Sequence, residues 1–132
     1  MKEYVLKTKH LFLGAIAIDS DALLYALWKV EHAIKISAIR LGVDATCTKA
    51  DTNYNTLTVR NGSVDVAAVA NGPVTGGTTF TLGTFGDMVV ATAAGANILA
   101  AGDTLSLKVT KTGNGLAMAG VVMQIEYYDY DS

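Results

Sequence analysis

The chain has 132 residues, a length typical of a single domain with one core. Charged residues make up 17% and hydrophobic residues 51%, whereas an average soluble domain is about 25% charged. So little charge favours assembly with other subunits or a larger body, although Thr, Ser, Asn and Gly offer an alternative means of solvation. The ten Lys and Arg residues are scattered and the net charge is −2, which argues against nucleic acid as a partner.

The N-terminal stretch is predicted to be an extended arm or a first edge strand. We take residues 1–15 as a possible arm and residues 16–132 as the domain, and we expect a buried strand over residues 12–18. The apolar run 11–18 is too short to span a membrane, which needs about 20 residues. Glu3 in its basic flank argues against a secretory signal.

Residues 22–30 (ALLYALWKV) fit either a helix or a strand. A helix would gather Leu23, Leu24, Leu27 and Trp28 on one face, whereas a strand would set Leu24 and Trp28 on the face opposite Leu23 and Leu27. We favour the strand because the surrounding segments have a β pattern.

Apolar residues change face within the next segment. Ile34 and Ile36 share one parity, whereas Ile39 and Leu41 share the other, so a β-bulge is predicted near Ser37 and Ala38. Residues 44–53 are predicted to form a loop. This loop holds Cys47, the only cysteine, which excludes an intrachain disulfide and is interpreted as a small buried apolar residue.

Residues 56–67 alternate around Asn61-Gly62, which predicts a β-hairpin with a type I′ turn. Residues 71–77 are predicted to be a loop, and residues 78–82 and 87–92 short strands. A connection of small residues follows at 93–101, with residues 97–99 tucked against the sheets.

The last third predicts two strands, over residues 104–111 and 121–128, joined by a glycine-rich loop at 112–115. On the second strand Val122 and Tyr128 fall on the outward face, where we expect a subunit interface. In all, about eight short strands with turns every 8–12 residues predict an all-β, single-domain antiparallel β-sandwich or a barrel.

No arrangement of residues predicts catalysis. His10 and His32 have no partner at metal-ligand spacing, and the Asp pairs at 19/21 and 129/131 lack the other ligands of a Ca²⁺ loop. There is no Gly-x-Ser-x-Gly motif and no phosphate-binding glycine loop before a helix. We therefore expect no enzyme activity, no catalytic residue, no metal and no cofactor.

Aromatic residues offer two candidate contact sites. Tyr127, Tyr128 and Tyr130 are typical of an interface, although Tyr127 could instead close the core. Trp28 with Tyr25 could form a sugar-stacking platform, but we favour core packing.

Two segments carry a resemblance to a known family. Residues 51–62 (DTNYNTLTVRNG) and 101–115 (AGDTLSLKVTKTGNG), the latter followed by 124–127 (QIEY), are similar to segments of small structural proteins of tailed bacteriophages. The similarity covers roughly residues 34–128. It implies a jelly-roll β-sandwich that acts as a decoration, or cement, protein on the outer surface of the head and is made in the host cytoplasm.

The resemblance also implies partners and contacts. The partners would be the major capsid protein and further copies of the chain, as a homotrimer, with no nucleic acid and no membrane. The expected capsid or subunit contacts are Tyr4, Leu6, Phe12, Val122, Tyr127, Tyr128 and Tyr130. The alternative is a tail-associated or receptor-binding β-sandwich that binds a glycan through Trp28, Tyr25 and loop 71–77.

Overall fold

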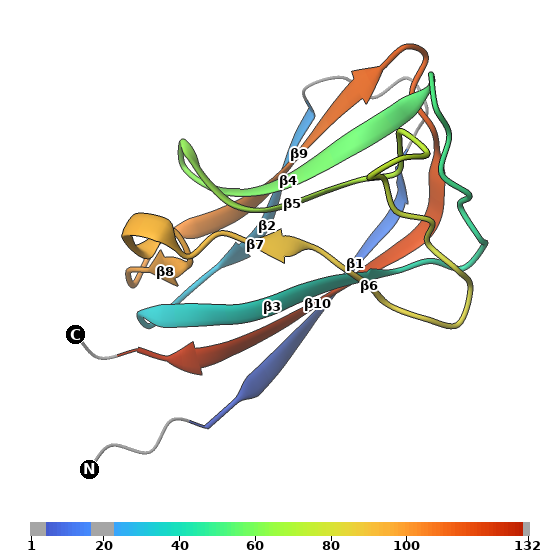
Figure 1. The fold of residues 1–132 in the computed structure, drawn as a ribbon. Helices are drawn as coiled ribbons and strands as arrows, with labels where there is room; N and C mark the ends of the chain where they lie inside the picture. Colours follow the sequence, from blue (N-terminus) through green and yellow to red (C-terminus); the bar gives the residue numbers. More distant parts are fainter. Residues whose placement is uncertain (1–4, 17–22, 131–132) are drawn as a thin grey trace.

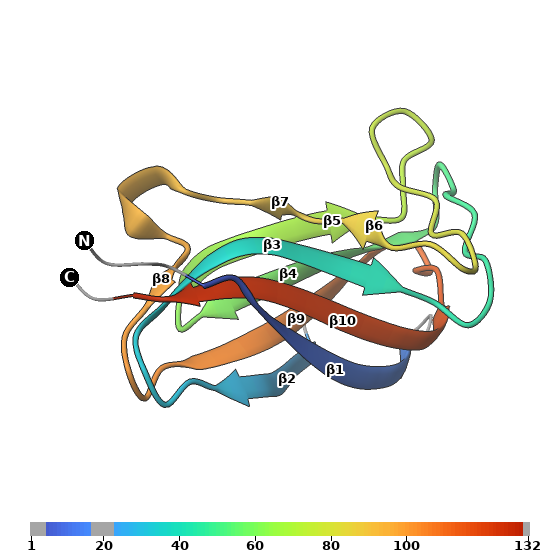
Figure 2. The same ribbon diagram turned by 90° about the horizontal axis from the view of Figure 1, so that it is seen from below.

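The structure is a computed structural model, and it describes residues 5–16 and 23–130. Two antiparallel sheets face each other in two layers (Figures 1 and 2). This arrangement confirms the predicted all-β antiparallel sandwich. In the described part of the chain no helix is long and apolar enough to cross a membrane.

Each sheet combines long strands with short ones. The first sheet has the order β1-β10-β3-β6, with β8 also pairing β3. Its bounds are β1 Lys7–Ile16, β10 Met118–Asp129, β3 Ile34–Gly42, β6 Gly86–Asp87 and β8 Ile98–Leu99. The second sheet has the order β2-β9-β4-β5-β7, with bounds β2 Leu23–Lys29, β9 Thr104–Thr112, β4 Tyr54–Asn61, β5 Val64–Ala70 and β7 Val89–Val90. The described residues thus form ten strands rather than the predicted eight, and three of the ten are only two residues long.

The core lies between the two sheets and follows the period-two pattern of the sequence. In β9 Leu105, Leu107 and Val109 are buried, whereas their neighbours face outward. In β10 Val121, Met123 and Ile125 are buried, as is Met118 at the start of the strand. Alternation of this kind buries one face of each sheet, so the predicted inward and outward faces of both strands are confirmed.

The change of face in β3 has the predicted cause. Glu126 pairs with Ala38 and Tyr127 with Ile36, so Ser37 has no partner in the β10 register and forms a bulge. Both apolar sets, before and after Ser37, are therefore buried in the same core.

The hairpin between β4 and β5 is confirmed, but the predicted type I′ turn is wrong. Asn61 pairs with Val64, which leaves Gly62 and Ser63 as the loop. Gly62 has φ 62°, and it is the only one of these loop residues in the left-handed region. Glycine at the first loop position is the requirement of a type II′ turn, whose twist also matches paired strands.

The N-terminal stretch is an edge strand rather than an arm from Lys7 onward. β1 pairs with β10 from Lys7↔Tyr127 to Ile16↔Met118, so the sandwich begins before residue 16. The prediction of a buried strand over 12–18 is wrong for Phe12, whose side chain is 78% exposed. Residues 17 and 18 lie outside the described part. Strand β2 confirms the strand interpretation of residues 22–30 from Leu23 to Lys29.

Between β5 and β9 the chain is less regular than predicted. Residues 78–82 are not a strand, because only Phe80 forms an isolated bridge, with Cys47. Residues 87–92 divide into β6 and β7 on different sheets, and buried Met88 marks the crossing between them. Residues 97–99 do lie against the sandwich, since β8 pairs with β3 and Asn97 Nδ2 donates a 2.8 Å hydrogen bond to Ile36 O.

Candidate interaction surface

A row of apolar residues crosses the outer face of the first sheet. Phe12 on β1 pairs with Val122 on β10, which in turn pairs with Gly42 on β3. The ring of Phe85 lies above Gly42, where an added Cβ would be 3.1 Å from Phe85 Cε1. Phe12 and Phe85 are 78% and 47% exposed. We call Phe12, Val122, Gly42 and Phe85 the apolar row.

Two glycines make this row a hollow rather than a flat surface. Gly42 and Gly120 line a hollow of about 360 Å³ together with the two phenylalanines and Val122. At Gly120 an added Cβ would lie within 2.7 Å of the carboxylate atoms of Asp44, and φ is 54°, so only glycine fits there. The backbone therefore shapes the hollow.

Arg40, the cation beside the apolar row, already has partners. The Arg40 guanidinium donates to the carboxylates of Glu126 and Asp87, the latter at 3.0 Å. Arg40 also lies 3.4 Å from Gln124 Oε1. The hydrogen bond to Glu126 is the main reason that the pKa of Arg40 is raised, which keeps this side chain charged and paired. The centre of the sheet face is thus compensated internally.

The other predicted contact residues lie elsewhere. Leu6 precedes β1 and is 48% exposed, and Tyr4 lies outside the described residues. Tyr127 packs against the core, with its ring 5.0 Å from that of Trp28 in an edge-to-face arrangement. Tyr128 falls on the outward face opposite Lys35, and the Tyr130 N–H donates to Ala33 O. Of the predicted contact residues, Phe12 and Val122 are neighbours in the apolar row.

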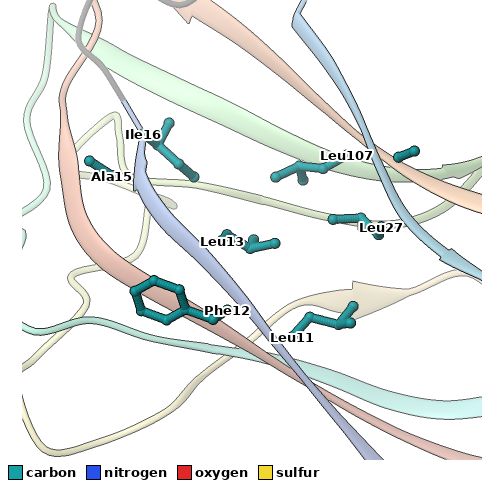
Figure 3. A pocket seen from close by; sticks show the side chains of 8 residues that line it. Leu11, Phe12, Leu13, Ala15, Ile16, Leu27 and Leu107 are labelled. Atoms are coloured by element: carbon teal, nitrogen blue, oxygen red, sulfur yellow. The ribbon is translucent and has the colours of Figure 1, made fainter.

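A second apolar surface opens on the flank between the edge strands β1 and β2. It is a cleft of about 220 Å³, and Phe12 belongs to its lining as well as to the apolar row. The other large side chains that line it are Leu11, Leu13, Ile16, Leu27 and Leu107 (Figure 3). Both strands pair on one side only. The other edges of the two sheets are the two-residue strands β6 and β7, so each sheet has one long edge, β1 or β2. Residues of both long edges line this cleft, so the two edges lie on the same flank.

The structure separates the parts of the predicted glycan platform. Trp28 pairs with Leu105, which pairs with Asn61 at one end of the second sheet. Loop 71–77 follows Ala70, which pairs with Thr56 toward the other end of that sheet. Trp28 is also half-buried, with the Lys9 ammonium 5.6 Å from its ring centroid. The prediction of a single glycan-binding surface built from Trp28 and loop 71–77 is therefore wrong.

Within the described residues no group of three His, Cys, Asp or Glu side chains is placed to hold a metal ion. Cys47 is buried as predicted, and its Sγ lies 3.6 Å from Asn71 Nδ2. Burial raises the pKa of the Cys47 thiol, which the hydrogen bond from Asn71 partly offsets. A raised pKa leaves less of the reactive thiolate at any given pH.

We expect Cys47 in the folded protein to react with an aromatic disulfide reagent at pH 8 at least about tenfold more slowly than in denaturant, because the reagent must wait for local opening. Absorbance of the released thiol measures both rates. Equal rates would show that the thiol is accessible in the folded state.

The sequence pattern identified Phe12 and Val122 but missed Phe85, Gly42 and Gly120. A glycine on the outward face of a strand is the signal that could have indicated a close approach or a hollow. Its partner Phe85 lies in a loop 43 positions further along the chain, which no periodicity connects to β3.

Comparison with known proteins gives no relative. No protein-family model matches the chain, no curated protein matches it, and no solved structure matches it.

Proposed function

We propose that this protein is a virion structural protein, a decoration protein that binds the outer surface of a tailed-phage capsid through the major capsid protein and stabilises the head. The observation that carries this proposal is the apolar row on the outer face of the first sheet, where two phenylalanines are exposed beside a hollow. Exposed apolar patches of this kind mark interaction sites. The phage context rests on the sequence resemblance.

We also propose that the sandwich is of the jelly-roll type. Support comes from the ladders, which pair β1 with β10, β2 with β9, β3 with β6 and β4 with β5. A long antiparallel hairpin folded over into two sheets has this sequence of pairs. Successive strands β1 to β5 then alternate between the sheets except at the β4–β5 hairpin.

The mechanism would be mechanical rather than chemical. A decoration subunit placed across neighbouring capsid subunits buries apolar area on each of them, and each buried Å² contributes about 25 cal/mol. A homotrimer holds three such contacts at once, so modest affinities multiply. The low charge content of the chain fits this use, since less of the surface has to face water.

The proposal is tested by mixing the purified protein with heads that lack it. We expect the protein to sediment with the heads, to have the native mass of an oligomer, and to raise the temperature at which the heads break. A monomer that stays in the supernatant would contradict the proposal.

The second candidate, a tail-associated or receptor-binding module, rests on the polar pocket of about 340 Å³ that Trp28 lines together with Lys7, Lys9 and Tyr127. A glycan array separates the two candidates. A decoration protein should give no signal on it, whereas a receptor-binding module should bind specific glycans.

A further inference from the structure

We propose that the hollow between Phe12 and Phe85 is the capsid-facing contact, that it receives an uncharged apolar side chain of the capsid surface, and that contacts between copies of this chain lie elsewhere. This inference rests on the proposed function and assigns it to one face. The competing occupant is a second copy of the chain.

The exposed area argues against a second copy in the hollow. A phenylalanine side chain offers about 200 Å², so the exposed fractions of 78% and 47% leave about 250 Å² on the two rings together. A two-fold contact between copies would cover about 500 Å² of ring surface, whereas a specific interface needs about 1,000 Å² or more. The two rings are therefore too small to hold a dimer alone. The same area suffices as one of several simultaneous contacts on a repeating surface.

The charges indicate an uncharged occupant. Arg40, the nearest cation on the sheet face, is already paired with Glu126 and Asp87. Asp44 is the single charged residue that lines the hollow. A charged partner group would lose its hydration without gaining a free counter-charge, apart from a cation at Asp44. An apolar side chain loses no hydrogen bond on entering.

The shape of the hollow also favours an apolar side chain as its occupant. Gly42, Gly120 and Val122 line the hollow together with both phenylalanines, and the Phe85 ring packs against Gly42. Aromatic side chains around a central recess are typical of the residues that dominate binding energy in protein interfaces. A partner side chain would be held between Phe12 and Phe85 and would shield both rings from water.

Three single variants test the assignment on intact heads that lack the protein. Phe12→Ser removes one wall, and its high exposure leaves the core unchanged. Gly42→Ala places a methyl group 3.1 Å from the Phe85 ring and so displaces that wall. Val89→Ser is the matched control, because Val89 is 81% exposed but belongs to β7 of the second sheet. Thermal unfolding verifies that each variant is folded.

We expect Phe12→Ser and Gly42→Ala to weaken binding to heads at least about tenfold, with the native mass of the oligomer unchanged and Val89→Ser equal to the original protein. Binding of Phe12→Ser at full strength would overturn the assignment and leave the proposed function intact. A fall in oligomer mass in both Phe12→Ser and Gly42→Ala would show that a second copy fills the hollow, which also overturns the assignment. If the original protein fails to bind heads, the proposed function itself fails.

Discussion

Replacing Phe80 by alanine is expected to lower the free energy of unfolding by about 3–5 kcal/mol, the range seen when a buried phenylalanine is truncated. Phe80 is 1% exposed and lies between β5 and β6, in a segment that is not itself a regular strand. Its backbone is fixed to Cys47 by two hydrogen bonds of 2.8 and 2.9 Å. The ring lies against Gly86, where an added Cβ would be 2.8 Å from it.

The loss of unfolding free energy is expected to be large because the residues around Phe80 cannot move in to fill the space that the ring leaves. The ring occupies space beside two backbone segments that are held by their own hydrogen bonds, so truncation leaves a cavity. Denaturation in urea measures the change. Phe85→Ala is the control, because Phe85 is 47% exposed and should lose about 1 kcal/mol or less. A loss below about 1 kcal/mol in Phe80→Ala would show that residues 78–82 contribute little to the core.

The second large effect is expected from Asn71→Ala, with a loss of about 2–3 kcal/mol in unfolding free energy. Asn71 is fully buried at the end of β5. Its Oδ1 accepts a 2.7 Å hydrogen bond from the Asn55 N–H, and its Nδ2 donates a 3.1 Å hydrogen bond to Leu116 O. One side chain therefore joins β4 to the segment that leads into β10.

The loss arises because alanine removes the acceptor of a buried backbone N–H, and desolvated polar groups are costly when a partner is removed. Asn61→Ala provides a matched control from the other Asn-Gly pair in the β4–β5 region. Asn61 is only half-buried and donates a 3.0 Å hydrogen bond to Asp103, so its loss should stay near 1 kcal/mol. Equal losses in the two variants would contradict the structural role given to Asn71.

The two-residue period made much of the fold predictable. In β9 and β10 it predicted which side chains are buried, and in β3 the change of parity located the bulge at Ser37. Both results depend on local order, since neighbouring residues on a strand face opposite sides of a sheet. The hairpin at Asn61-Gly62 was predictable for the same reason, although its turn type depended on the register, which places Asn61 inside β4.

The features that the sequence did not predict depend on contacts between residues far apart in the chain. The choice between an arm and an edge strand for the N-terminal stretch is decided by β10, more than 100 residues later, which pairs with β1. Phe80 is held by a bridge to Cys47 rather than by a strand of its own. The hollow is formed only when Phe85 from a loop lies over Gly42 of β3. Tertiary pairing decides such features, and propensity carries little information about it.

We propose the outer face of β1, β10 and β3 as the protein-binding surface of a structural assembly. Electron cryomicroscopy of heads incubated with the protein tests this most directly. We expect added density on the outer head surface, with this face, including Phe12 and Phe85, turned toward the capsid subunits. Absence of added density, or a bound subunit that turns this face to solvent, would contradict it.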